Sequence, residues 1–181
     1  MLLMNVPPSE RLSYQLMSEK DADLLFQLDQ DSAVMKYING GKLSSREQIE
    51  SISLPRMKSY TNQAKGWGLW KVTLTETAEF FGWILVRPMD YFSDKPQYQN
   101  LELGWRFNRK SWGKGYATEA ASALKHAIIQ KGDVSKLTAI AMEDNRASLK
   151  IMINLDMQYV KTYTHKDPLG DMEVALYELE I

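Results

Sequence analysis

Cysteine is absent from the sequence, and histidine occurs only twice, as His126 and His165. The absence of cysteine excludes disulfide bonds, thiolate metal sites and an acyl intermediate carried on cysteine. Two histidines argue against a histidine-rich metal site, so we expect no metal. A chain without cysteine is compatible with a reducing cytoplasm, which is the localisation that we predict.

A surplus of one charge and long apolar segments are lacking as well. The 22 basic and 23 acidic residues leave a net charge of −1, so bulk charge gives no reason to expect a nucleic-acid partner. No apolar run approaches about 18 residues, the length that spans a membrane. The first ten residues, MLLMNVPPSE, contain no basic region of the kind that begins a signal peptide. We therefore expect no membrane partner.

The composition that is present is typical of a globular protein. Hydrophobic residues make up 44% and charged residues 25% of 181 residues. This length suffices for one ordinary domain with a real core, and we see no repeat or linker that divides it. The sequence predicts a single domain over residues 1–181, as a monomer or a homodimer.

The most informative stretch covers residues 101–130 and predicts a strand, a glycine loop and a helix. In residues 101–107 apolar side chains occupy the odd positions, which is the alternation of a half-buried strand. From Tyr116 onward the apolar residues follow helical spacing, and Gly132 provides a C-terminal cap.

The junction between that strand and that helix suits an anion. Gly113 and Gly115 lack Cβ atoms, so a ligand can approach the backbone closely. The first N–H groups of a helix are unpaired and carry partial positive charge, which fits a diphosphate. A glycine turn without any ligand is the alternative interpretation. Two other nucleotide motifs do not match, because no G-x-x-x-x-G-K-[ST] string occurs and Thr118 replaces the third glycine of G-x-G-x-x-G.

The string W-G-K-G-Y-A-T-E-A at residues 112–120 resembles the acyl-CoA pyrophosphate loop of the GNAT N-acetyltransferases. It is most similar to the branch that includes the ribosomal-protein N-terminal acetyltransferases. Lys110 stands where the family pattern [QR]-x-x-G-x-[GA] has glutamine or arginine, and it keeps the charge without a planar fork of donors. The resemblance implies acetyl-CoA as co-substrate. It also implies these cofactor-binding residues: Trp105, Phe107, Lys110, Trp112, Gly113, Lys114, Gly115, Tyr116, Ala117 and Asn145.

The order of elements along the chain agrees with the resemblance. Strands are expected over residues 11–17, 67–75, 79–87, 101–107, 136–142, 159–165 and 172–180. Helices are expected over 19–30, from Ser44-Ser45 to about residue 64 with a kink or restart at Pro55, over 116–130, and from 145 to 155. Residues 31–42 read as irregular, and 89–100 as a long loop. The predicted fold is α/β, a GNAT-like mixed, mostly antiparallel sheet of about seven strands with helices on both faces. In that fold acyl-CoA enters where the fourth and fifth strands splay apart.

Two side chains are candidates for catalysis. Glu102, on the polar face of the central strand, can bind an ammonium group and pass on its proton, directly or through water. Its alternative is a strand glutamate in a salt bridge, with Arg106 as a candidate partner. Ser148 follows Asn145 in an N-x-x-S string, and its hydroxyl can hydrogen-bond the departing CoA sulfur. The alternatives are a serine bonded to a preceding carbonyl and an asparagine that only caps its helix. His165 ends a strand near the expected acceptor side.

These features predict an N-acetyltransferase that moves an acetyl group directly from acetyl-CoA to a primary amine. The acceptor is a peptide or protein N-terminus or a small-molecule amine, and its specificity is expected to lie in loops such as residues 31–42 and 89–100. A non-catalytic module that binds acyl-CoA for regulation is the alternative. Such a module would need the glycine loop but neither Glu102 nor Ser148.

Overall fold

A seven-stranded sheet forms the centre of the computed structural model, which describes residues 2–181. The strand order is β1-β2-β3-β4-β5-β7-β6. The strands are β1 Leu12–Leu16, β2 Gly68–Leu74, β3 Phe80–Met89, β4 Gln97–Phe107, β5 Lys136–Ala141, β6 Gln158–His165 and β7 Met172–Glu180. Only β4 and β5 pair in parallel, so the predicted mixed and mostly antiparallel sheet is confirmed.

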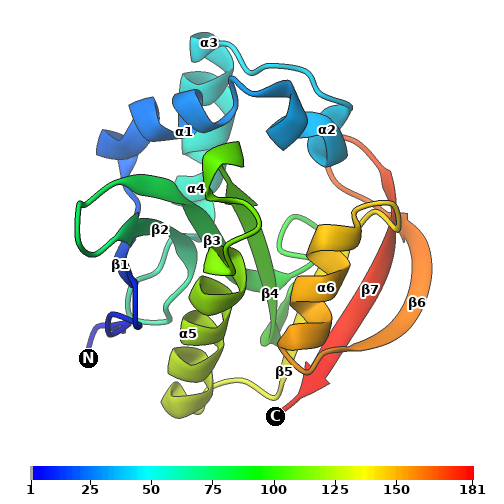
Figure 1. Ribbon diagram of the computed structural model, residues 1–181. Helices are drawn as coiled ribbons and strands as arrows, with labels where there is room; N and C mark the ends of the chain where they lie inside the picture. Colours follow the sequence, from blue (N-terminus) through cyan, green and yellow to red (C-terminus); the bar gives the residue numbers. More distant parts are fainter. Residues whose placement is uncertain (1) are drawn as a thin grey trace.

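Helices cover both faces of this sheet (Figure 1). In the view shown, α5 (Tyr116–Lys131) and α6 (Arg146–Asn154) lie in front of it. The N-terminal helices pack on the other face and around the upper edge: η1 Glu19–Asp21, α1 Ala22–Leu28, α2 Ser32–Asn39, α3 Arg46–Gln48, the π-helical turn η2 Ile49–Ser53, and α4 Leu54–Tyr60. No helix within residues 2–181 is both long and apolar enough to cross a membrane.

Two hydrophobic cores follow from the alternation of side chains in the central strands. Leu101, Leu103 and Phe107 of β4 belong to the larger core, together with the buried face of α5 around Leu124. The second core joins Leu85 of β3 to buried side chains of α1, η2 and α4. Because side chains alternate along a strand, the even positions of β4 face this second layer of helices.

Three expectations about the N-terminal half need correction. Residues 31–42 are not irregular, because Asp31 caps the helix α2 by accepting a hydrogen bond from the Ala33 N–H, and Gly40 ends it with φ of 80°. The loop expected over residues 89–100 is shorter, because β3 continues to Met89 and β4 already begins at Gln97. The helix after Ser45 forms, but it passes into the π-helical turn η2 before Pro55 and ends at Tyr60, short of residue 64.

Candidate functional site

The sheet divides between β4 and β5. These strands pair only over Asn100–Glu102 and Lys136–Thr138, and then residues 103–107 and 139–141 continue without pairing to each other. The predicted separation of the fourth and fifth strands is therefore present, and it begins directly after Glu102.

Backbone N–H groups of β4 point into this gap. Asn108, directly after β4, donates its N–H to the Phe81 carbonyl oxygen of β3 at 2.8 Å. Successive N–H groups of a strand point in opposite directions, so this bond shows which N–H groups of β4 face β3. By that alternation the N–H groups of Trp105 and Phe107 face away from β3, toward the gap. The Phe107 carbonyl oxygen already accepts a hydrogen bond from Trp112 Nε1 at 3.0 Å. The two N–H groups remain as donors for an extended ligand.

The glycine loop closes one end of the gap. Gly113 and Gly115 have φ of 72° and 78°, values that residues other than glycine rarely adopt. A Cβ atom added at Gly113 would meet no heavy atom within 4 Å, so the space beside it is open. Gly115 is the N-cap residue of α5, and within residues 2–181 no side chain caps the first N–H groups of this helix. Those groups are free to bind an anion.

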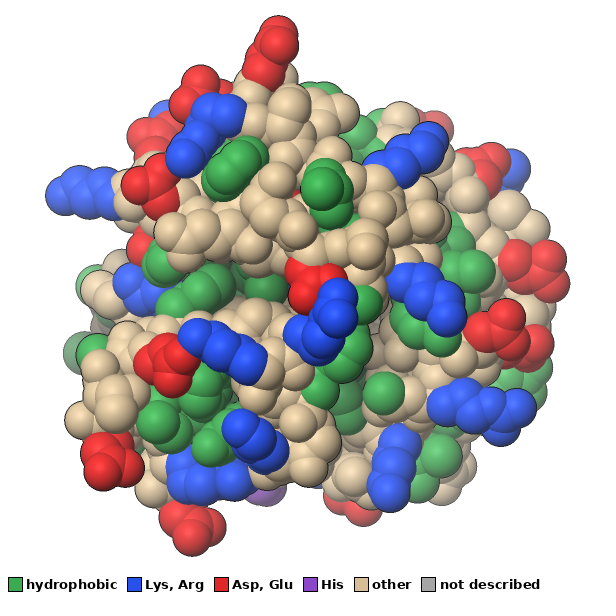
Figure 2. All heavy atoms as spheres, turned by 45° about the horizontal axis from the view of Figure 1, so that its top comes forward, with side chains coloured by type: hydrophobic (Ala, Val, Ile, Leu, Met, Phe, Trp, Pro, Cys, Tyr) green, Lys and Arg blue, Asp and Glu red, His purple; other side chains and the backbone are tan. Residues whose placement is uncertain are grey.

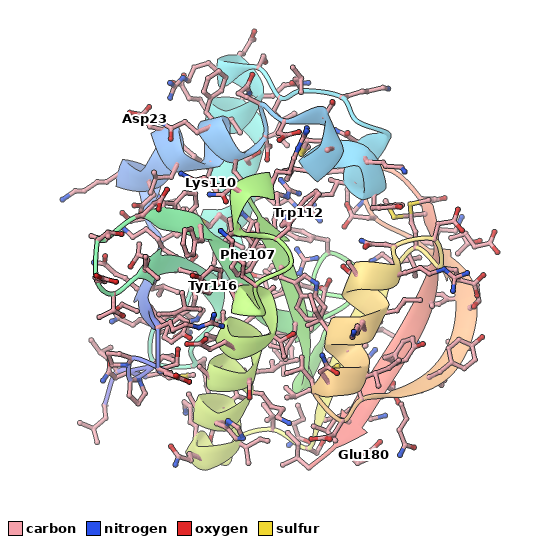
Figure 3. The ribbon with its side chains drawn as sticks, in the orientation of Figure 1. Asp23, Phe107, Lys110, Trp112, Tyr116 and Glu180 are labelled. Atoms are coloured by element: carbon pink, nitrogen blue, oxygen red, sulfur yellow. The ribbon has the colours of Figure 1, made fainter. Side chains whose placement is uncertain are left out.

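Most cations around the loop are already paired. Lys110 forms an ion pair with Glu79, and Arg109 forms one with Asp31. Lys114 has no carboxylate within ion-pair distance among the residues that the structure describes. Figure 3 shows Lys110 and Trp112 near the N-terminal end of α5, and Figure 2 shows Lys and Arg side chains prominent on this face. Lys114 and the helix end therefore provide the uncompensated positive charge.

A network that the sequence did not reveal holds this loop against β1. Arg11 donates from Nη1 to the Lys114 carbonyl oxygen at 2.9 Å, and its Nε donates to Glu119 at 2.7 Å. Glu119 also accepts hydrogen bonds from the Arg11 N–H and the Ser9 hydroxyl. Burial alone would raise the pKa of the Glu119 carboxyl, but these hydrogen bonds outweigh it and hold the pKa below its usual range. Residues so distant in sequence offer no local pattern from which to predict this contact.

Ser148 faces β4 from α6. Its Oγ accepts a hydrogen bond from Trp105 Nε1 at 3.1 Å. This partner lies on β4 and is not the preceding carbonyl of the alternative interpretation. This contact fixes the hydroxyl oxygen and leaves its proton available to another acceptor. Asn145 caps α6, because its side chain accepts a hydrogen bond from the Ser148 N–H at 3.3 Å. The capping interpretation of Asn145 is thus confirmed, and its contact with pantetheine remains a prediction.

A buried lysine joins α5 to the C-terminal end of α6. Asp156, which follows this helix, has φ of 67° where glycine would be favoured. Lys125 of α5 is buried and donates to the Leu155 carbonyl oxygen at 3.0 Å and to Asp156 at 3.1 Å. The lysine therefore hydrogen-bonds a carbonyl group at the end of α6, where glycine is absent. It also connects the two helices that border the gap.

Glu102 lies on the opposite face of the sheet from Ser148. It is 6% exposed, and its Oε2 accepts a hydrogen bond from Arg87 Nε at 2.9 Å. Its partner is therefore Arg87, whereas Arg106 donates to Asp29 at 2.7 Å. Burial opposes charge on the Arg87 guanidinium, yet the Glu102 carboxylate outweighs burial and raises the pKa of the arginine. Glu102 also borders a small hollow between the β3–β4 and β6–β7 loops.

Aromatic side chains of the β3–β4 loop form one wall of that hollow. Tyr91 and Phe92 contact each other edge to face, with ring centroids 5.1 Å apart, and both pack against Tyr60 of α4. Their position beside Glu102 agrees with an acceptor side on this face. Within residues 2–181, no three histidine or acidic side chains are grouped as metal ligands would be.

The split sheet, the two N–H groups of β4 and the uncapped end of α5 together suit an elongated anionic ligand. Comparison with known proteins agrees: the family model of the acetyltransferase (GNAT) domain matches residues 11–158. The chain is 30% identical to YkkB of Bacillus subtilis, over 94% of this chain and 92% of YkkB. It is 25% identical to FsC-acetyl coenzyme A-N(2)-transacetylase of Aspergillus fumigatus, over 86% of this chain and 66% of that protein.

A solved structure has the same fold. RimL, a ribosomal L7/L12 alpha-N-protein acetyltransferase in complex with coenzyme A, superposes with a TM-score of 0.72 at 15% identity, over 97% of each chain. The chain belongs to the GNAT family and is an acetyltransferase. The predicted family resemblance is confirmed, and this result favours the enzyme over the regulatory module.

Proposed function

We propose that the chain transfers an acetyl group directly from acetyl-CoA to a primary amine, at the N-terminus of a peptide or protein or on a small molecule. The gap between β4 and β5 carries this proposal. It has an uncapped helix end and an open glycine at one end, and Ser148 and Glu102 on its two faces. The names of the Aspergillus fumigatus relative and of RimL, which describe acetyl transfer, support it.

The residues present fit acetyl-CoA. The loop of Gly113 and Gly115, with Lys114 and the first N–H groups of α5, would hold the diphosphate. The N–H groups of Trp105 and Phe107 would bind the amide groups of pantetheine. The bound thioester would supply an activated acetyl group beside the split, and one domain over residues 1–181 would contain the whole site.

Two side chains serve the reacting groups in this proposal. The Ser148 hydroxyl, held by Trp105, would donate a hydrogen bond to the departing sulfur. Glu102 would hold the acceptor ammonium through Oε1, because Oε2 is bound to Arg87. The amine would therefore enter from the face that bears the hollow.

An acceptor screen tests the proposal. The purified protein is incubated with acetyl-CoA and, separately, a peptide with a free N-terminus, a polyamine and an amino sugar. We expect CoA thiol release that requires one class of amine, together with an acetylated product identified by mass spectrometry. Reactions without amine measure hydrolysis. Thiol release that is equal with and without every amine would contradict transfer to an amine.

A further inference from the structure

A histidine, His165, also lines the hollow beside Glu102. The hollow lies between the β3–β4 loop, which begins at Asp90, and the β6–β7 loop, which follows His165. The His165 side chain is 12% exposed, so it is largely enclosed but still reachable from the hollow. Its neighbour Asp90 has φ of 57°, a strained value for a residue other than glycine. Strain of this kind concentrates at functional sites.

Glu102 is already the partner of a buried cation. Its carboxylate is bound to Arg87, and both side chains are almost fully buried. The exposed fraction of the side chain is 8% for Glu102 and 11% for Arg87. Adding a proton to Glu102 would neutralise the partner of a buried guanidinium and leave that charge uncompensated. The carboxylate can still attract an ammonium ion through Oε1, and a second group that takes the proton would leave this ion pair intact.

The surroundings of His165 suit that task. Its Nδ1 lies 2.9 Å from the Tyr163 hydroxyl and 4.0 Å from Asp90 Oδ1. Burial raises the pKa of Tyr163 to about 12, and the negative charges of Asp90 and Glu102 add to this, so the phenol stays neutral. With a proton on Nδ1, that nitrogen would donate to the Tyr163 oxygen and face the Asp90 carboxylate. Nε2 then carries the lone pair that can accept a proton.

Asp90 is the carboxylate near the ring that no lysine or arginine neutralises among residues 2–181. Three other carboxylates near the ring are paired with cations: Glu102 with Arg87 of β3, Asp167 with Arg56 of α4, and Asp171 with Lys166. Asp90 has no lysine or arginine partner among residues 2–181, and Gln97 donates a hydrogen bond to its second oxygen at 2.7 Å. The negative charge of Asp90 is therefore available to stabilise an imidazolium ion.

We propose that His165 is a catalytic residue that takes the proton of the acceptor ammonium, while Glu102 holds the amine and Asp90 positions the ring. This assignment rests on the proposed function. The N–H bond of the ammonium breaks as an N–H bond forms at His165 Nε2. The freed lone pair forms the C–N bond, and the C–S bond breaks. The second amine proton passes to the sulfur, giving CoA thiol, and the imidazolium releases its proton to water.

The two histidines provide a matched test. His126 lies on the exposed side of α5, away from the hollow, so His126→Gln is the control for His165→Gln. We measure kcat/KM for the amine between pH 5.5 and about pH 9, since imidazoles change charge between about pH 5 and 8. His126→Gln should match the wild type. His165→Gln should lose about 10²- to 10⁴-fold at neutral pH and lose the acid limb of the profile, with an unchanged Kd for acetyl-CoA.

Nuclear magnetic resonance of His126→Gln, in which His165 is the only histidine, gives an independent measure of the protonation of its imidazole. We expect the proton on Nδ1 and a titration that coincides with the acid limb of kcat/KM. A wild-type profile in His165→Gln, or a ring titration that does not coincide with that limb, would overturn the assignment. A wild-type protein that acetylates no amine would instead refute the proposed function.

Discussion

Replacing Gly113 by alanine should separate ligand binding from folding. An added Cβ meets no heavy atom within 4 Å, so the cost to folding comes only from the positive φ of 72°. For residues other than glycine this conformation costs about 1–2 kcal/mol. In a protein of this size that corresponds to a melting temperature lower by about 2–8 °C.

The same methyl group should obstruct the proposed diphosphate site. If it prevents one hydrogen bond to a charged oxygen, the loss is about 1.5–3 kcal/mol. That energy corresponds to a roughly 10- to 150-fold higher Kd for acetyl-CoA. Isothermal titration calorimetry measures this Kd, and thermal unfolding without ligand measures the cost to folding.

Gly132→Ala is a closely matched control. Gly132 ends the same helix α5, has φ of 78°, and also has no heavy atom within 4 Å of an added Cβ. Both variants should lose similar stability, but Gly132→Ala should bind acetyl-CoA as the wild type does. Equal affinities in the two variants would refute the location of the diphosphate at Gly113.

Two further predictions concern Ser148 and Glu119. Ser148→Ala removes one hydrogen bond to the departing sulfur, so kcat should fall about tenfold with an unchanged Kd for acetyl-CoA; an unchanged kcat would exclude this role. Glu119→Gln should lower the free energy of unfolding at pH 7 by about 1.5–3 kcal/mol, because the carboxylate accepts hydrogen bonds from Arg11 and Ser9. The pKa of Glu119 is lowered on folding, so this stabilisation is present above the ordinary carboxyl pKa and is lost as the pH falls through the lower folded value. Urea unfolding should therefore show the two proteins converging in acid; a difference that persists there would contradict the charge-based explanation.

Local periodicity was sufficient for the elements that flank the ligand site. The alternation in residues 101–107 and the helical spacing after Tyr116 predicted β4 and α5, and both loop glycines have the positive φ that glycine permits. The expectation of an irregular stretch over residues 31–42 is wrong because Asp31 and Gly40, residue types common in loops, here cap the two ends of α2. In that case the capping signals were present in the sequence.

Long-range partners could not be predicted in the same way. Arg106 is four residues from Glu102 on β4, about 13 Å away at the rise of a strand, so it is too far to be the partner. The cross-strand register, which places Glu102 opposite Arg87, decides the ion pair. The meeting of His165 with Asp90 depends on how two loops from distant strands pack. Spacing within one segment does not identify Arg87 or Asp90 as the partner.

Under the proposed function, the short pairing between β4 and β5 would also link the stability of the folded protein to acetyl-CoA. Three residue pairs hold the strands together, and beyond them the N–H groups of Trp105 and Phe107 lack a neighbouring strand. Under the proposed function acetyl-CoA fills this gap only in the folded chain, so by mass action it adds about 2.7 kcal/mol of stability at one hundred times its Kd. Amide hydrogen exchange at these positions and degradation by proteases should both slow as acetyl-CoA rises. The abundance of the enzyme would then follow the metabolic supply of the molecule that it consumes.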